Sequence, residues 1–169
     1  MTPSDPILVE RASIEDAGEI LALQQLAYVR EAEIIDDFPI PPLHQTLIET
    51  LAEFEQQVLL KVVQYGRIIG SVRSLLDGET CYVGKLIVHP DLQNQGIGTT
   101  LLHAAEQQFP TAERYELFTG VQSAKNLPIY WKAGYRAFER KVVSSKLTLV
   151  YLEKRGHRAM SESTTRESR

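Results

Sequence analysis

The sequence predicts a single α/β domain in which a mixed, twisted sheet of about seven strands packs with four helices. Strand-like and helix-like spacings of apolar residues follow one another in the order β, α, α, β, β, β, α, β, α, β, β. Asp77-Gly78, between two apolar runs, is typical of an antiparallel hairpin. The strand–helix–strand order over 79–120 predicts a parallel crossover. We therefore expect the strand through Val88 to lie centrally and parallel to the strand through Phe118.

The first elements are expected to be a strand over 7–12 and a helix that Ser13 caps, with Asp16 in a capping-box position. The apolar face of this helix comprises Ala17, Ile20, Leu23 and Ala27. Prolines at 39, 41 and 42 end it, because proline is not tolerated inside a helix. A second helix is expected over 43–54. Its predicted core face comprises Leu47, Leu51 and Phe54.

Later elements follow the same spacing rules. They are expected at 58–64 (strand), 67–76 (strand), 79–88 (strand), 96–109 (helix), 114–120 (strand), 123–133 (helix), 135–142 (strand) and 146–153 (strand). Gly84 lies inside the strand over 79–88, and a glycine there indicates a bulge or a close backbone approach. The domain is expected to cover 1–153. The polar tail over 154–169 is expected to be disordered.

The composition bounds the class of protein. With 43% hydrophobic and 24% charged residues the chain is expected to be globular, and its net charge of −4 argues against a nucleic-acid partner. No apolar run approaches the ~20 residues of a membrane span, and residues 1–6 lack the regions of a signal peptide. The single cysteine, Cys81, excludes an internal disulfide, so a cytoplasmic location is expected. The four histidines show no metal-ligand spacing, and no metal is expected.

Gly96 and Gly98 lie between the strand that ends at Val88 and the helix that follows. Glycine allows close approach of a ligand to the backbone, and the first N–H groups of a helix form an anion site with the positive end of its dipole. A nucleotide P-loop would need a lysine directly after Gly98. The dinucleotide fingerprint would need a glycine where the chain has Leu101. The turn therefore predicts a phosphate site of another kind.

The six residues Gln93-Asn94-Gln95-Gly96-Ile97-Gly98 resemble the Gln/Arg-x-x-Gly-x-Gly/Ala motif that binds the acyl-CoA pyrophosphate in the GNAT superfamily of N-acetyltransferases. A second stretch, from Leu117 to Tyr135, resembles another motif of this family, in which a helix carries a tyrosine four residues before Gly-Tyr or Gly-Phe. Tyr130 matches that tyrosine. The order of elements is also similar to the family's, so the resemblance covers Ile7 to Glu153 and implies a GNAT-like fold.

The resemblance implies acetyl-CoA as acetyl donor and a role for each matching segment. The pyrophosphate would lie on the backbone of Gln93 to Thr99, and the pantetheine arm along Leu86, Ile87 and Val88. Tyr130 would give a proton to the leaving thiolate, which a phenol of pKa about 10 can do. The alternative for Tyr130 is packing on the sheet with its hydroxyl in water.

The chain departs from the family pattern at one position. Many members carry an asparagine seven residues before the tyrosine, where it contacts pantetheine, and this chain has Ser123 there. The nearest asparagine is Asn126, which either caps the helix or touches CoA. Ser123 and Asn126 are therefore both candidate CoA contacts.

The amine acceptor is the least determined part of the prediction. Residues 31–60 contain seven acids and no Lys or Arg, so this segment carries −7 and the rest of the chain +3. These acids either solvate the surface or attract a cationic amine. The candidate acceptor contacts are Glu31, Asp36 and Tyr82. The general base stays open among Glu31, Asp36, Asp37, Glu79 and Tyr82.

Two functions from different classes follow. The first is an N-acetyltransferase that passes acetyl directly from acetyl-CoA to a primary amine of a small molecule or peptide. The alternative is a GNAT-fold protein that senses acyl-CoA without turnover. A third, weaker hypothesis is a phosphate-binding α/β protein unrelated to CoA. No nucleic-acid or membrane partner is expected, and a homodimer is left open.

Overall fold

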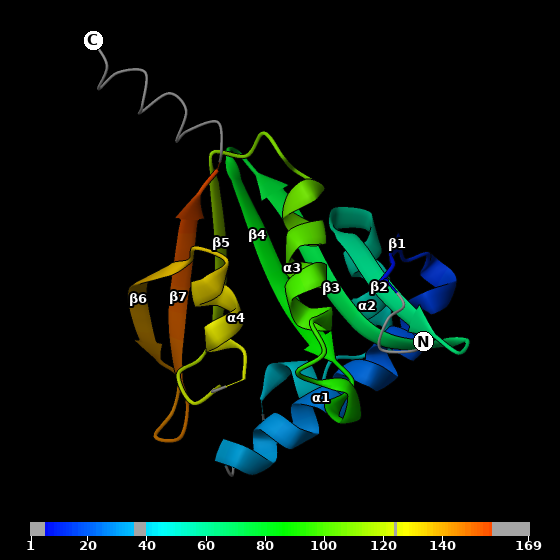
Figure 1. The fold of residues 1–169 in the computed structure, drawn as a ribbon. Helices are drawn as coiled ribbons and strands as arrows, with labels where there is room; N and C mark the ends of the chain where they lie inside the picture. The colour runs from blue at the N-terminus through cyan, green and yellow to red at the C-terminus, as the bar shows by residue number, and fades with distance from the viewer. Residues whose placement is uncertain (1–5, 36–39, 124, 157–169) are drawn as a thin grey trace.

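The computed structural model describes residues 6–35, 40–123 and 125–156. Its helices and strands follow the predicted order (Figure 1). They are β1 (Val9–Arg11), α1 (Ala17–Ile35), α2 (Leu47–Gln56), β2 (Val58–Gln64), β3 (Arg67–Asp77), β4 (Thr80–Val88), α3 (Ile97–Gln107), β5 (Arg114–Gly120), α4 (Leu127–Lys132), β6 (Arg136–Val142) and β7 (Thr148–Arg155). Short 3-10 turns precede α1 (Ile14–Asp16), α2 (Pro41–Leu43) and α3 (Pro90–Leu92).

The seven strands form one sheet in the order β1-β2-β3-β4-β5-β7-β6. Strand β4 is its central strand and pairs in parallel with β5, whereas its other neighbour, β3, is antiparallel. The predicted central position of the strand through Val88 and its parallel pairing with the strand through Phe118 are therefore confirmed. The remaining pairs of neighbouring strands are antiparallel, and two of them, β2–β3 and β6–β7, are hairpins.

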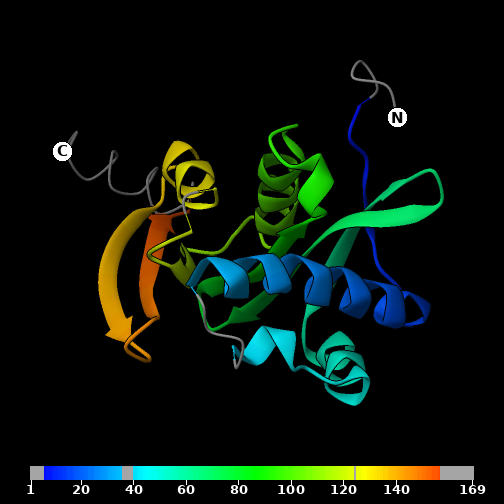
Figure 2. The ribbon, with the colours of Figure 1, turned by 90° about the horizontal axis from the view of Figure 1, so that it is seen from below.

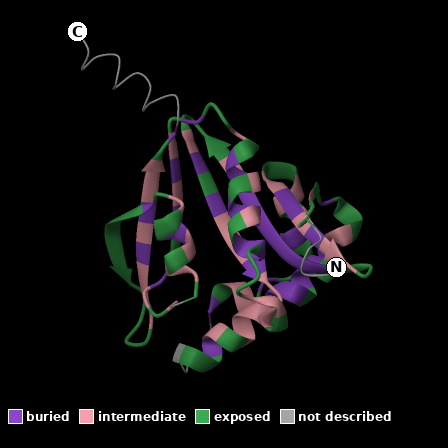
Figure 3. Ribbon diagram, in the orientation of Figure 1, coloured by how far each residue is buried: buried purple, intermediate pink, exposed green. Residues whose placement is uncertain are grey.

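Helices cover both faces of the sheet: α1 and α2 lie on one face and α3 and α4 on the other (Figure 2). The larger core cluster joins α3 and α4 to the sheet through residues such as Leu101, Tyr115 and Leu152, all at most 3% exposed. A second cluster joins α1 to the other face through Ile20, Leu23 and neighbouring strand residues. The outer strand β6 contributes to neither cluster, and its residues are exposed (Figure 3).

Strands β4 and β5 pair only over Thr80 to Tyr82 and then separate (Figure 1). The cause is a bulge in β4: the ladder with β3 shifts between Ser71 and Arg73, so that Lys85 and Leu86 together face a single residue, Val72. The bulge is where Gly84 predicted it, but the positive φ belongs to the neighbour, Lys85, at 47°.

Some element bounds differ from the prediction. Helix α2 begins at Leu47, not at 43, because Thr46 and Glu49 form a capping box. Leu47 therefore lies in the first turn and is 46% exposed, so its expected place in the core is wrong. Helix α4 is shorter than 123–133, since it begins after Asn126 with Pro128 in its first turn.

The last strand extends beyond the expected domain end at 153. Strand β7 continues to Arg155, and Lys154 forms an ion pair with Glu106 on α3, with Nζ 2.5 Å from Oε2. This pair attaches the end of β7 to α3. The rest of the predicted tail, 157–169, lies outside the described residues.

Candidate active site

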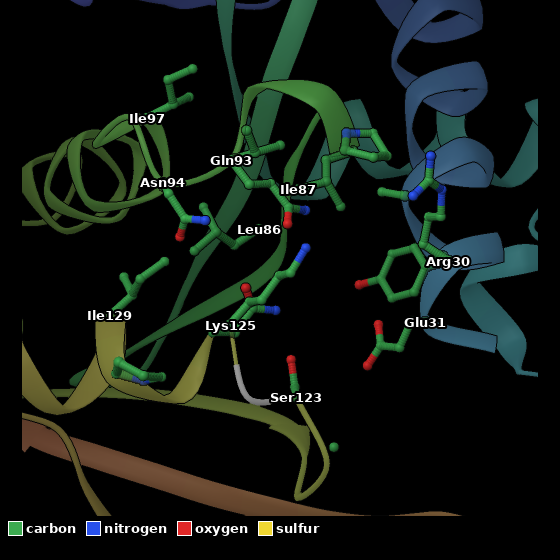
Figure 4. Close-up of a pocket in the computed structure, with 18 of the residues that line it drawn as sticks. Arg30, Glu31, Leu86, Ile87, Gln93, Asn94, Ile97, Ser123, Lys125 and Ile129 are labelled. Atoms are coloured by element: carbon green, nitrogen blue, oxygen red, sulfur yellow. The ribbon is translucent and has the colours of Figure 1, made fainter. Parts of the chain in front are cut away.

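The separation of β4 and β5 opens a cavity of about 920 Å³ between α1, the β4–α3 turn and the segment before α4 (Figure 4). Most of the residues predicted to bind CoA line it. They are Leu86, Ile87, Val88, Gln93, Asn94, Gly96, Ile97, Gly98, Thr99, Ser123 and Asn126. Segments separated by about 100 residues in sequence therefore share one cavity, as a ligand site between sheet and helices requires.

One wall of the cavity is the turn from Gln93 to Thr99. Asn94 and Gly96 have positive φ values of 64° and 83°, and Gly96 caps α3. The first helical hydrogen bond runs from the Thr100 N–H to the Gly96 carbonyl at 3.1 Å. The N–H groups of the three residues between them have no partner within the helix. They point out of the helix end, where an anion is favoured by the dipole.

A second wall is the edge of β4 that turns away from β3. The His89 N–H donates to the Ile69 carbonyl on β3 at 2.8 Å. Backbone groups alternate between the two edges of a strand, so the N–H and carbonyl of the preceding Val88 point to the opposite edge. Pairing with β5 has already ended at Tyr82. The Val88 backbone thus faces the cavity instead of a neighbouring strand, and it can pair with an extended ligand.

Tyr130 lies on α4 just behind the cavity wall. It is 5% exposed and meets Tyr135 edge to face, with ring centroids 6.2 Å apart. Burial, and then the nearby Tyr28 and Glu31, raises the pKa of its hydroxyl. The phenol therefore stays protonated well above neutral pH. It is not among the residues that line the cavity, so its expected place beside a bound sulfur stays a prediction.

Glu31 lies on α1 at the opposite end of the cavity, and its side chain projects into the cavity (Figure 4). One of its carboxylate oxygens, Oε1, lies 3.6 Å from the position that a Cβ on Gly120 would occupy, so Glu31 reaches the end of β5. Burial raises the pKa of Glu31. A carboxylate with a raised pKa in a cavity is suited to accept a proton near neutral pH.

The structure does not bring every predicted residue to the cavity. Tyr82 lies on β4 before the bulge, is 38% exposed and does not line the cavity. Gln95 also lies outside the lining, although the turn that contains it forms a wall. Glu79 lies in the turn of the β3–β4 hairpin and is likewise absent from the lining. The proposed acceptor contact Asp36, and Asp37 beside it, lie outside the described residues.

Sequence reasoning missed several lining residues, among them Tyr28, Lys125 and Leu147. Tyr28 lies one helical turn before Glu31 on the same face of α1. Burial, and then the Glu31 charge, raises the pKa of its hydroxyl, which the nearby Arg73 opposes. Leu147, from the β6–β7 connection, packs with Ala32 of α1. The spacing of Tyr28 and Glu31 was visible in the sequence, whereas the approach of the β6–β7 connection was not.

Within 6–35, 40–123 and 125–156 there is no group of three His, Cys, Asp or Glu residues placed to hold a metal ion. In the same part of the chain, no helix has the length and apolar character needed to span a membrane.

Comparisons with known proteins bear on the family and the fold of the chain. The B. subtilis UPF0157 protein YqkA is 31% identical over 123 residues, which are 73% of this chain but 35% of that protein. The chain thus spans about a third of the length of this relative.

Solved structures of N-acetyltransferases have a similar fold. The Thermoplasma acidophilum PaiA N-acetyltransferase in complex with coenzyme A gives a TM-score of 0.73 at 16% identity, over 89% of this chain and 99% of that one. The Escherichia coli ribosomal-protein-S18-alanine N-acetyltransferase gives 0.71 at 14% identity, over 89% and 94%. The family model of the acetyltransferase (GNAT) domain matches residues 32–155. The chain therefore belongs to the GNAT acetyltransferase domain family.

Proposed function

We propose that the protein transfers an acetyl group from acetyl-CoA directly to a primary amine. One observation carries the proposal: a single cavity joins the free N–H groups at the start of α3 to the open edge of β4. A pyrophosphate fits the first and an extended pantetheine arm fits the second. The solved relatives include one bound to coenzyme A and one, Salmonella typhimurium yncA, bound to acetyl-CoA.

The α3 end of the cavity suits the nucleotide half of CoA. The N–H groups of Ile97, Gly98 and Thr99 would donate to phosphate oxygens, and the positive φ of Gly96 lets the turn bend around them. Lys125 and Lys132 also line the cavity and add positive charge on the α4 side. Bound acetyl-CoA supplies the activated acyl group.

Val88 would act on the acyl group at the β4 edge. Its N–H points into the cavity, where it can donate to the acyl oxygen as negative charge develops there. Tyr130 would donate its proton to the departing sulfur. Its raised pKa keeps the hydroxyl protonated at neutral pH, so that it can give a hydrogen bond or its proton to the thiolate as this forms.

Glu31 is our choice among the candidate bases, because it lines the cavity, whereas the other two candidates that the structure describes, Glu79 and Tyr82, do not. An ammonium must lose a proton before its nitrogen can attack, and an amine of pKa about 10 is almost fully protonated at pH 7. The Glu31 carboxylate would first attract the cation and then take its proton. A cationic primary amine, free or on a peptide, is therefore the proposed acceptor.

The test combines binding with turnover. Calorimetry should show CoA binding, and release of free thiol should follow when acetyl-CoA is mixed with a panel of small amines and peptides with free amino groups. Mass spectrometry of the product should show the addition of one acetyl group to nitrogen. Binding without thiol release from any amine would favour the acyl-CoA sensor instead. Absence of CoA binding would refute both.

A further inference from the structure

A polar cluster joins four elements beneath the bulge in β4. It consists of Gln24 on α1, Gln45 before α2, Glu53 on α2, Arg73 on β3 and Lys85 on β4. Arg73 is 2% exposed, although arginine is among the residues least often buried. No residue of this cluster lines the cavity, so binding of CoA does not explain it.

Glu53 lies at the centre of the cluster, with one carboxylate oxygen for each strand. Oε1 is 2.5 Å from Lys85 Nζ, and Oε2 forms an ion pair with Arg73 Nε at 2.7 Å, although not with the alignment of a hydrogen bond. Gln45 donates to Oε1 at 2.7 Å and accepts from Lys85 Nζ at 2.7 Å. Gln24 accepts from Arg73 Nη1 at 2.9 Å. These contacts restrain the positions of β3 and β4 relative to α2.

The two cations come from the two strands that meet at the bulge, β3 and β4. Arg73 faces Gly84 in the last regular pair before it, whereas Lys85 is inside it with φ of 47°. A residue with a Cβ is strained in this left-handed region, so the bulge needs support from its surroundings. Burial lowers the pKa of both Arg73 and Lys85, and the Glu53 charge opposes this for both. The other charged or titratable neighbours are Glu49, beside Lys85, and Tyr28, beside Arg73.

We propose that Glu53 is a positioning residue, which holds the β4 bulge in place by pairing both with Arg73 on β3 and with Lys85 inside the bulge. The bulge separates β4 from β5 and leaves the Val88 backbone free to face the cavity. Loss of this restraint moves the acyl site while the turn at the start of α3 stays in place. The inference rests on the proposed function only where turnover is the readout.

The first test compares Glu53→Gln with Glu55→Gln, an exposed neighbour on the same helix. We expect Glu53→Gln to lower kcat by about 10- to 100-fold, since small misplacements of a reacting group have such effects. The affinity for 3′-phosphoadenosine 5′-diphosphate, which occupies only the nucleotide end, should change less than about twofold in both variants, because the α3 turn is separate from the cluster. Equal kcat for the two folded variants would overturn the proposal.

The second test covers the case in which Glu53→Gln fails to fold. Lys85→Ala and Lys85→Gly both remove the ion pair, but only glycine accepts the positive φ without strain. Hydrogen exchange of the Ile87 amide, opposite Ser71 in the ladder, needs no ligand and should be about five- to tenfold faster in the alanine variant. Equal exchange in both would overturn the proposal. If the parent protein bound CoA but transferred no acetyl group, only the proposed function would fail, because this readout stands without turnover.

Discussion

The two ends of the cavity are built in different ways. At the α3 end, Gln93 to Thr99 form the wall as one continuous stretch, and the features that matter belong to the backbone: positive φ values and unpaired N–H groups. At the α1 end, Tyr28, Glu31 and Leu147 meet from two parts of the chain, and side chains make the wall. A backbone site depends on a few glycines at fixed spacing, whereas a side-chain site can change its chemistry with single substitutions.

Charge follows the same division. The α4 side of the cavity carries Lys125 and Lys132, and the α1 side carries Glu31 and Glu33 together with Arg30. Positive charge near the nucleotide end suits phosphates, and a partly buried carboxylate at the other end suits an ammonium. The difference implies that substitutions at one end should alter CoA affinity and those at the other end should alter amine use. Substitutions at each end can test whether CoA affinity and amine use are separate.

The largest effect is expected at Tyr130, on α4 behind the cavity wall. Tyr130→Phe should lower kcat by about 10²–10⁴-fold if proton donation to the thiolate is its whole role. CoA affinity should stay the same, because the ring and its contact with Tyr135 remain. Stopped-flow or steady-state thiol release, with calorimetry for CoA, measures both. An unchanged kcat would return Tyr130 to a packing role.

At the α1 end, Glu31→Gln should lower kcat/KM by about 10²-fold near pH 7, the lower part of the range for general-base catalysis. The carboxylate accepts a proton only when ionised, and burial raises its pKa above the ordinary value of about 4.3. In the parent, log kcat/KM should therefore rise as pH increases through this raised pKa, and the variant should lose that limb. A pH profile with the same acidic limb in parent and variant would exclude Glu31 as the base.

At the α3 end, Gly96→Val should weaken CoA binding by about 10- to 100-fold, because valine is strained at positive φ and its side chain obstructs the phosphate. Gly78→Val is the matched control. Gly78 also has a positive φ, 62°, but belongs to the β3–β4 hairpin turn, outside the cavity. It should lose comparable stability in thermal unfolding and keep CoA affinity. Similar affinities for the two variants in calorimetry would contradict the phosphate site.

The sequence predicted the fold and the position of the turn before α3, because both depend on local patterns. Gly96 and Gly98 mark the turn, and apolar spacing marks the strands and helices around it. Leu47 was misplaced because a capping box at Thr46 outweighed apolar spacing. The positive φ at Lys85 could not be predicted, since it depends on contacts with Glu53 and Gln45, which are distant in sequence.

The α1 end was predicted in part. The seven acids over 31–60 predicted a negatively charged segment, but charge alone could not show which of them lie at the cavity. The structure places Glu31 and Glu33 at the cavity, whereas Glu53 is paired with Arg73 and Lys85, so that its charge is neutralised. Tyr28 belongs to no motif that the sequence shows. Its connection to the site is its position on the same face of α1 as Glu31.

The smallest predicted effect concerns the exposed Glu33, at the rim of the α1 end. If the rim attracts a cationic amine, Glu33→Gln should raise the apparent KM for a cation by about two- to threefold at low salt, as expected for one exposed charge. The increase should vanish at high salt, because the screening length falls to about 3 Å at 1 M. Glu55→Gln removes an equal charge on α2, away from the cavity, and should leave KM unchanged at both salt concentrations. Steady-state kinetics with one cationic and one neutral amine separate attraction from general changes in the enzyme, since only the cation should respond. A preference for the neutral amine, or equal KM values for the two variants, would show that the acids near the cavity serve only to solvate the surface.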